Sequence, residues 1–161
     1  MKKHNIILAV AVILLIALEQ GIKIIVNRFF LEANTPLIAS FVFFRPLFNR
    51  DYSWINSMLQ LGLGRTVHIA IVILVIIIVL AGYIYIKNRF GSSFLINAAF
   101  VLLLSGGACS LIDKVFWNGS LDYILLRGFF TFDLKDVYIN AALGLIILMF
   151  IIDHRGLRTK I

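Results

Sequence analysis

Four long apolar segments are the feature that most restricts how this chain can fold. They cover residues 5–26, 66–86, 93–112 and 136–152. The hydrocarbon core of a bilayer is roughly 30 Å thick, and an α-helix needs about 20 apolar residues to cross it. Within that core the backbone polar groups must pair with one another, which a helix achieves inside a single segment. The sequence therefore predicts an all-α membrane protein with four transmembrane helices.

The composition supports this class. Of the 161 residues, 61% are hydrophobic and 14% are charged, whereas a soluble domain has about half apolar and about a quarter charged residues. No linker-like tract divides the sequence, so we expect one integral-membrane domain over residues 1–161, present as a monomer. The net charge of +7 comes from basic residues scattered between the apolar segments. This distribution is typical of membrane topology and not of nucleic-acid binding.

The basic residues also predict the orientation. If both termini are cytoplasmic, residues 1–4, 87–92 and 153–161 face the cytoplasm and carry seven basic residues and one acidic residue. The rest of the chain carries eight basic and seven acidic residues. Cytoplasmic loops of membrane proteins carry an excess of Lys and Arg. We therefore expect both termini to be cytoplasmic and nearly all the acids, including Asp122 and Asp136, to face outward.

Aromatic residues are concentrated on the outer side of this topology. Of the 21 aromatic residues, 15 lie in the two outer connections, 24–64 and 113–138. Trp and Tyr collect at membrane interfaces because their rings suit the headgroup region. Residues 41–46 predict a short strand that ends at Pro46, and residues 54–63 predict a short interfacial helix. We expect a small extracytoplasmic cradle of β-like and amphipathic-helix segments, either as an aromatic belt or as a substrate-binding surface.

Asp122 and Asp136 are the candidate catalytic residues. Carboxylates near hydrocarbon are energetically unfavourable, so a pair at the membrane edge suggests a function. Two carboxyls that share one proton can hydrolyse a peptide bond, because the ionised one takes a proton from water while the protonated one polarises the carbonyl. Asp136 begins the last apolar segment, where the helix dipole favours its ionised form. The spacing alone leaves open the alternative that both are ordinary acids of the outer loops.

Other polar residues have structural interpretations. Glu19 and Lys23 lie four residues apart on one face of the first helix, in the order that favours an ion pair. Asp133 is a candidate N-cap of the fourth helix, with Asp136 three residues further on as its first-turn acid. The single cysteine, Cys109, excludes an intrachain disulfide, and the three histidines have no metal-ligand spacing. We therefore expect no metal site.

Five short motifs carry a resemblance to a known family. In chain order they are Glu19–Lys23, Asn49–Trp54, Gly106–Lys114, Leu121–Tyr123 and Phe132–Asp136. They resemble Asp-Gln-x-x-Lys, Asn-x-Gly-Ala-Ala-Phe, Gly-Gly-Ala-x-Gly-Asn-x-x-Asp-Arg, Val-Asp-Phe and Phe-Asn-x-Ala-Asp of the lipoprotein signal peptidases (signal peptidase II). The resemblance spans nearly the whole chain, with the same four-span arrangement.

The resemblance implies a function and a set of site residues. It implies an aspartic endopeptidase that removes signal peptides from diacylglyceryl-modified prolipoproteins, at the outer leaflet of the bacterial cytoplasmic membrane. Its partners would be these precursors and membrane lipids, and it would need no metal or cofactor. Asp122 and Asp136 would be catalytic. The supporting positions implied by the resemblance are Glu19, Lys23, Asn49, Ser110, Asp113 and Asp133.

The chain departs from the family motifs around the aspartate pair. The replacements are Glu19 for Asp, Cys109–Ser110 for Gly-Asn, Lys114 for Arg, Asp133 for Asn and Lys135 for Ala. Adjacent helical residues point about 100° apart, so Lys135 need not neutralise Asp136. These departures suggest a divergent member. They leave an alternative open, namely a catalytically impaired paralogue that binds lipidated peptides or partner helices.

Overall fold

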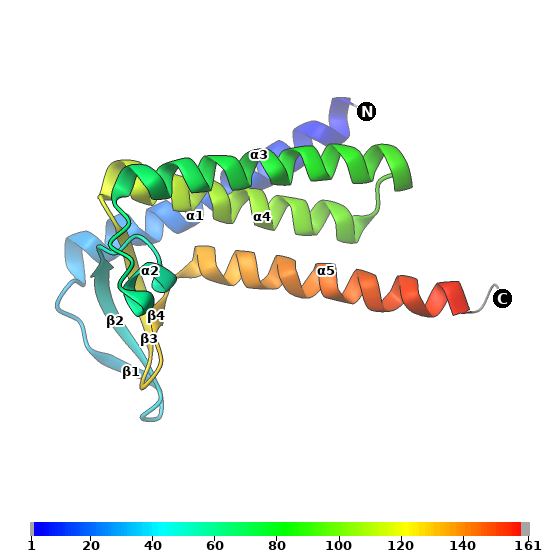
Figure 1. The fold of residues 1–161 in the computed structure, drawn as a ribbon. Helices are drawn as coiled ribbons and strands as arrows, with labels where there is room; N and C mark the ends of the chain where they lie inside the picture. The colour runs from blue at the N-terminus through cyan, green and yellow to red at the C-terminus, as the bar shows by residue number, and fades with distance from the viewer. Residues whose placement is uncertain (1, 159–161) are drawn as a thin grey trace.

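The computed structural model describes residues 2–158, which form a long helical bundle with a small sheet at one end (Figure 1). Met1 and residues 159–161, which belong to the terminal segments used above to predict orientation, lie outside the described residues. The sheet projects from the end of the bundle that is remote from both chain ends (Figure 1).

Four helices are long and apolar enough to cross a membrane, as predicted. The spanning stretches are Lys3–Phe29, Arg65–Arg89, Phe94–Trp117 and Leu134–Ile151. They belong to helices α1 (Lys2–Phe29), α3 (Arg65–Phe90), α4 (Phe94–Ile112) with its π-helical continuation η1 (Asp113–Trp117), and α5 (Leu134–Arg158). Most helices run beyond the predicted apolar segments because their last turns contain charged residues, which a hydropathy pattern excludes.

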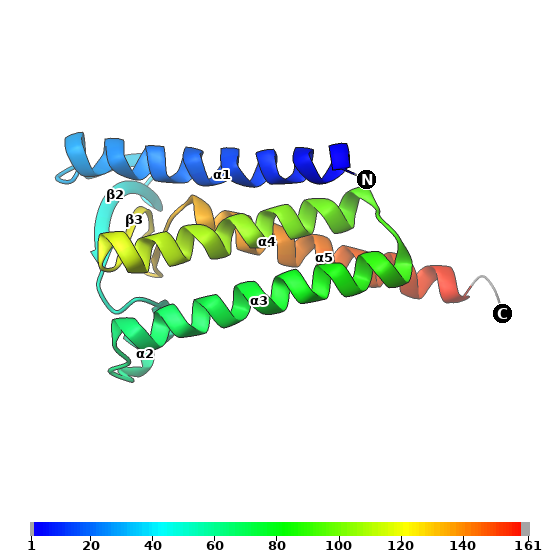
Figure 2. The ribbon, with the colours of Figure 1, turned by 90° about the horizontal axis from the view of Figure 1, so that it is seen from above.

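Helix α4 is the centre of the bundle and packs against α1, α3 and α5 (Figure 2). Two adjacent glycines allow this close packing. A Cβ atom on Gly106 would lie 2.6 Å from Cγ1 of Ile139 on α5, and one on Gly107 would lie 3.1 Å from Cγ1 of Ile76 on α3. Small residues at these positions let the helices approach closely, as is common where lipid supplies no hydrophobic driving force between helices.

The predicted β-like cradle is an antiparallel sheet in the order β1-β2-β3-β4. Its strands are β1 (Thr35–Ile38), β2 (Val42–Asn49), β3 (Ser120–Leu126) and β4 (Thr131–Phe132), and helix α2 (Trp54–Leu59) follows β2. The predicted end of the first strand at Pro46 is wrong. The register shifts between Phe44 and Leu47, so Pro46 lies in an irregularity and β2 continues to Asn49. A bulge tolerates proline because no ladder hydrogen bond is required there.

Helix α2 is shorter than the predicted interfacial helix. Ser53 caps its N-terminus by accepting a hydrogen bond from the backbone N–H of Asn56, and the left-handed residue Gln60 ends it. The sheet and α2 expose many large apolar side chains, including Leu37, Ile38, Phe41, Trp54 and Phe129. Exposed apolar surface of this extent marks a membrane or ligand contact.

A small hydrophobic core fixes the sheet to α1. Val26 of α1 packs with Leu121 and Tyr123 of β3, and all three are buried. Because successive strand residues point to opposite faces, Leu121 and Tyr123 anchor β3 to this core while Ser120 and Asp122 face the other way. The core therefore determines where Asp122 points.

Candidate active site

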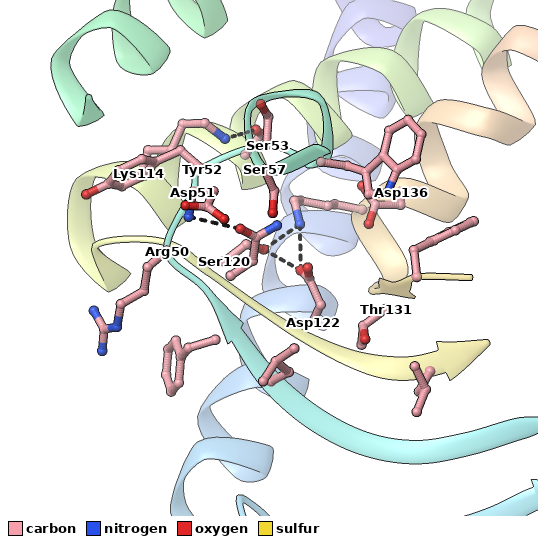
Figure 3. Close-up of a pocket in the computed structure, with 18 of the residues that line it drawn as sticks. Arg50, Asp51, Tyr52, Ser53, Ser57, Lys114, Ser120, Asp122, Thr131 and Asp136 are labelled. Carbon is pink, nitrogen blue, oxygen red and sulfur yellow. Dashed lines mark hydrogen bonds and ion pairs between the residues drawn. The ribbon is translucent and has the colours of Figure 1, made fainter. Parts of the chain in front are cut away.

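The structure brings the two predicted catalytic residues together. Asp122 lies on β3 and Asp136 lies in the first turn of α5. Oxygen atoms from the carboxylates of Asp122, Asp133 and Asp136 all lie within 4.8 Å of one another. Figure 3 shows Ser120 and Asp122 projecting from β3 toward the same space that Asp136 approaches from α5. The chain between β3 and α5, which includes β4, thus brings together Asp122 and Asp136, 14 positions apart in the sequence.

Asp122 is almost completely buried, with 6% of its surface exposed. The hydroxyl of Ser120 donates a hydrogen bond to Oδ1 of Asp122 at 2.6 Å. Burial raises the pKa of Asp122, because removing a carboxylate from water disfavours its charged form, and the ammonium of Lys135 opposes that rise. Asp122 is therefore suited to holding a proton at a pH where an exposed aspartate would have lost it.

Asp133 caps α5, as predicted, and the cap is reciprocal. The backbone N–H of Asp136 donates to Oδ1 of Asp133 at 3.3 Å, and the backbone N–H of Asp133 donates to Oδ2 of Asp136 at 3.2 Å. This is the arrangement of a capping box. One oxygen of Asp136 is thereby held at the N-terminus of α5, which fixes its carboxylate beside Asp122.

The second oxygen of Asp133 has a different partner, which the sequence did not predict. It lies 2.7 Å from Nζ of Lys23 and in contact with Nζ of Lys135. Although burial raises the pKa of Asp133, the two ammonium groups lower it further, so the pKa lies well below its ordinary value. Asp133 is therefore an ionised carboxylate that belongs to an ion network as well as a cap.

The predicted pair Glu19–Lys23 is present and is part of this larger network. Nζ of Lys23 lies 3.2 Å from Glu19, 2.5 Å from Asp113 and 2.7 Å from Asp133, and all four side chains are fully buried. The hydroxyl of Tyr123 donates to Oε2 of Glu19 at 3.0 Å. Burial, and the nearby Glu19, raise the pKa of Tyr123, so its hydroxyl remains a donor. Charges in such surroundings need complete pairing, and this network joins α1, η1, β3 and α5.

The contacts of the Lys135 ammonium are a part of the site that the sequence did not predict. Its Nζ donates to Ser120 at 2.7 Å and lies 3.3 Å from Asp113 and 3.5 Å from Asp122. Its ion pairs among the described side chains are with Asp113, Asp122 and Asp133, in keeping with the expectation that Lys135 need not neutralise Asp136. The sequence did not predict that it enters the acid cluster. Its position two residues after the replacement of Asn by Asp133 was the available signal.

The other predicted supporting residues contribute to the wall of the site. Asn49 ends β2, and its side chain accepts a hydrogen bond from the backbone N–H of Asp51 at 3.0 Å, which shapes the following loop. Ser110 on α4 accepts from Nζ of Lys114 at 2.9 Å. Both line the cavity described below. Their hydrogen bonds in the described part of the chain do not reach Asp122 or Asp136.

Gln20 is a site residue that the sequence did not single out beyond its place in a motif. Its Nε2 donates to Asp113 at 3.3 Å, and its Oε1 accepts from the indole N–H of Trp117 at 3.0 Å. Asp113 and Lys114 lie on the π-helical turn η1, where both are buried. Such turns are common at functional sites because they direct neighbouring side chains inward.

Gly119 permits the turn from η1 into β3. Its φ is +149°, and a Cβ atom would lie 2.7 Å from the backbone oxygen of Asn49. Any other residue would push the two strands apart at this point, because the obstructing atom belongs to the backbone. Gly119 therefore lets Ser120 pair with Asn49 and places Asp122 opposite Leu47.

The aspartates open onto a cavity of about 850 Å³ between the sheet, α2 and α5. Its walls combine acids, hydroxyls and apolar side chains, including Leu47, Phe48, Ser53, Trp54, Phe129, Phe130 and Asn140. A concave space of this size is typical of a site for an organic ligand, and here most of the lining residues are polar or charged. Both predicted catalytic residues form part of its wall.

The spacing of Asp122, Asp133 and Asp136 would let one cation contact all three carboxylates. In this chain an ammonium group already contacts two of them, since Lys135 pairs with Asp122 and Asp133. The cluster therefore carries its own counter-charge. The chemistry best suited to such acids is general acid–base catalysis on a bound water.

These features define a class, a membrane protein with four spanning helices and an aspartate pair, one buried and one partly buried, at the sheet-bearing end. The family model "Signal peptidase (SPase) II" matches residues 11–152. The chain is 31% identical over 152 residues to the lipoprotein signal peptidase of Fusobacterium nucleatum, covering 92% of this chain and 88% of the relative. It is also 31% identical over 154 residues to that of Brucella ovis, covering 92% of each chain. The protein belongs to the signal peptidase II family.

Solved structures agree with the fold. A bacterial membrane enzyme determined at 2.3 Å resolution superposes with a TM-score of 0.73 at 18% identity, over 92% of this chain and 90% of the other. A second, determined at 1.9 Å, gives a TM-score of 0.71 at 17% identity, over 89% and 91% of the two chains. At these identities the likeness concerns the fold, namely the helical bundle with its antiparallel sheet.

Proposed function

We propose that this protein is an aspartic endopeptidase that removes signal peptides from diacylglyceryl-modified prolipoproteins. The observation that carries the proposal is the meeting of Asp122 and Asp136 on the wall of one cavity, with carboxylate oxygens within 4.8 Å. Relatives with about the same length and 31% identity are named lipoprotein signal peptidases. Lipidated precursors and membrane lipids would be its partners.

The two carboxyls would divide the chemistry. Asp136, at the N-terminus of α5, is the ionised partner because the helix dipole favours negative charge there. Asp122, whose pKa burial raises, is the protonated partner. Asp136 takes a proton from water as the water oxygen attacks the scissile carbonyl carbon, while Asp122 donates a hydrogen bond to the carbonyl oxygen. Collapse of the tetrahedral intermediate breaks the C–N bond, the leaving amine takes from Asp136 the proton that came from water, and the pair returns to one proton on Asp122.

We place the site on the outer side of the bacterial cytoplasmic membrane, with both termini inside and the protein as a single monomeric unit. Four crossings put the two chain ends together, and the sheet lies at the opposite end of the bundle. The charge distribution of the sequence assigns the ends to the cytoplasm. Introduced cysteines test this: Arg45→Cys should react with a membrane-impermeant maleimide in whole cells and Lys87→Cys should not. The reverse pattern would overturn the orientation.

A cleavage assay tests the function. The purified protein in liposomes should release a signal peptide from a diacylglyceryl-modified precursor and leave a product that begins with the lipidated cysteine, as identified by mass spectrometry. The same precursor without the lipid should remain intact. Failure to cut the modified precursor would exclude the proposed function.

A second candidate is a catalytically impaired paralogue that binds lipidated peptides or partner helices. The observation in its favour is Lys135, whose ammonium lies inside the acid cluster. This candidate predicts that the wild-type protein binds the modified precursor without cutting it, also in the double variant Asp133→Asn/Lys135→Ala. Cleavage by the wild-type protein would exclude it.

A further inference from the structure

The acid cluster contains a charge pair at two positions where the family motif has neutral residues. Asp133 stands in place of Asn and Lys135 in place of Ala. In the structure the two side chains contact each other directly. One negative and one positive charge have thus been added together, so the formal charge of the cluster stays the same. The two replacements compensate each other.

The ammonium of Lys135 also reaches Asp122, both directly and through Ser120. The direct distance to Oδ1 of Asp122 is 3.5 Å. Nζ of Lys135 donates to the hydroxyl of Ser120 at 2.7 Å, and that hydroxyl donates to Asp122 at 2.6 Å. Charge-assisted hydrogen bonds of this kind are strong and directional. A chain Lys135–Ser120–Asp122 therefore fixes Oδ1 of Asp122.

A serine beside a lysine can also form a nucleophile and its base, but the geometry disfavours that arrangement. The lysine must then be neutral, whereas the carboxylates of Asp113, Asp122 and Asp133 surround Lys135 and favour its charged form. The proton of Ser120 is directed at Asp122. Ser120 transmits a hydrogen bond and does not act as the attacking group.

We propose that Lys135 is a positioning residue of the Asp122–Asp136 pair and that it works as a unit with Asp133. The proposal rests on the proposed function, since it concerns how that aspartate pair is held and charged. Lys135 fixes Asp122 and supplies a positive charge beside it, while Asp133 keeps Lys135 in place and offsets that charge. The pair sets the pH range over which the aspartates hold one proton between them.

The groups that face Asp122 come from every element around it. They are Glu19 and Lys23 of α1, Asp113 and Lys114 of η1, Asp133, Lys135 and Asp136 at the start of α5, and Arg50 and Asp51 on the cavity wall. Of the ammonium groups, that of Lys135 is in ion-pair contact with Asp122. An opposite charge this close shifts the pKa of a carboxyl by roughly 1 unit or more. Removing it should shift both limbs of the pH–rate profile upward by about that amount.

A mutant cycle tests the inference, with kcat/KM for a diacylglyceryl-modified precursor measured from pH 4 to pH 9. Lys135→Met keeps much of the side-chain volume and removes the charge, so its profile should shift to higher pH by roughly 1 unit. Asp133→Asn removes the negative charge and should shift the profile to lower pH. The double variant Asp133→Asn/Lys135→Met should return close to the wild-type profile. Lys87→Met, a lysine at the other end of the bundle, is the matched control and should change nothing.

The alternatives give different results. A lower rate with an unmoved profile in Lys135→Met would overturn the proposal, because it would show a purely structural role. A Lys135→Met enzyme faster than wild type at every pH would also overturn it, since the lysine would then obstruct the site. If Lys135→Met does not fold, the proposal requires that Asp133→Asn still shifts downward and that the double variant folds and returns to the wild-type profile.

The outcomes also separate this proposal from the proposed function. If the double variant cleaves the precursor and the wild type does not, the positioning role is overturned. The aspartic mechanism would still hold for this fold. Cleavage by neither, with the precursor verified as lipid-modified, would overturn both.

Discussion

The two ends of the helical bundle hold their helices together by different means. At the sheet-bearing end the helices are joined by buried ion pairs, in which the ammonium of Lys23 contacts Glu19, Asp113 and Asp133. At the other end, where α3 turns into α4, the buried Asn97 has neutral partners: Tyr83 donates to Asn97 at 2.8 Å and Asn97 donates to Ser92 at 2.9 Å. The ammonium of Lys87 there donates to Asn5 at an exposed position. The ion pairs among the described side chains, those of residues 3–89 and 91–151, all belong to the first end.

The difference shows which contacts the fold needs and which the site needs. Burying an ion is unfavourable by several kcal/mol before its partners compensate. The other end shows that α3 and α4 are joined near their turn without a buried ion among the described side chains. Under the proposed function, the charged end holds groups whose placement serves chemistry, and the bundle tolerates them because each is paired. Ionisable residues within membrane helices commonly have this role.

Lys23→Met should reveal the largest difference in stability between the two ends. The substitution leaves Glu19, Asp113 and Asp133 without their shared cation, and breaking a buried ion pair by removing one partner destabilises by about 3–5 kcal/mol. Lys87→Met, whose ammonium contacts the exposed Asn5, should change stability by less than about 1 kcal/mol. Unfolding in detergent micelles measures both. Equal losses would show that the comparison between the ends is wrong.

Asp133 should make the folded protein less stable as the pH falls below about 4. Because the folded state lowers the pKa of this carboxyl, its contribution is present above the unfolded value of about 3.9 and is lost as the pH falls toward the folded value. Asp122, with its raised pKa, acts in the opposite sense. We expect the unfolding temperature of the wild type to fall below pH 4 more steeply than that of Asp133→Asn. Parallel curves for the two proteins would contradict this assignment.

A matched pair of tyrosines gives a finer comparison. Tyr123→Phe removes a hydrogen bond to the carboxylate of Glu19 and one from the backbone N–H of Leu134, and bonds to charged groups contribute about 1.5–3 kcal/mol. Tyr83→Phe removes a neutral bond to Asn97, which contributes about 1 kcal/mol. Thermal unfolding of the two variants should rank them in this order. A larger loss for Tyr83→Phe would reverse the comparison.

Packing at α4 predicts a smaller effect that does not depend on charge. Gly106→Ala would place a methyl group 2.6 Å from Cγ1 of Ile139, and overpacking of this kind destabilises by about 1–3 kcal/mol. Gly144→Ala meets no atom within 4 Å and should be neutral or slightly stabilising, because alanine favours a helix. Ile139→Ala removes the obstructing Cγ1, so Gly106→Ala should destabilise less in an Ile139→Ala background than in the wild type. Equal stability of the two alanine variants would show that α4 and α5 are not closely packed.

Much of the fold could be predicted from the sequence because it depends on local properties. Continuous apolar segments predict spanning helices, and Asp133 followed by Asp136 predicts a capped helix start. The extension of β2 through Pro46 could not be predicted, because the register shift that accommodates it depends on pairing with β3, more than 70 residues later. The sheet was expected only as a β-like cradle for the same reason.

Site residues that lie within a recognisable motif could be predicted from the sequence. Contacts that depend on the conformation of long side chains could not. Asp122 and Asp136 follow from the motifs that flank them. The contacts of Lys23 join residues 90 positions apart, which no local pattern specifies. Helix geometry determines the direction in which the Lys135 side chain leaves its Cα, but not where its ammonium group lies. Its long flexible side chain then places the ammonium against Asp133 and Ser120, at the wall of the cavity.

The most direct test of the account is precursor cleavage by Asp122→Asn and Asp136→Asn in liposomes. Each variant should insert and fold like the wild type, as judged by its unfolding temperature, and should lose at least about 100-fold in kcat/KM, the contribution expected of a general acid or base. Glu32→Gln makes the same chemical change at an exposed residue of the outer connection and should cleave at the wild-type rate. Cleavage at the wild-type rate by either asparagine variant would contradict the claim that these two aspartates perform the hydrolysis.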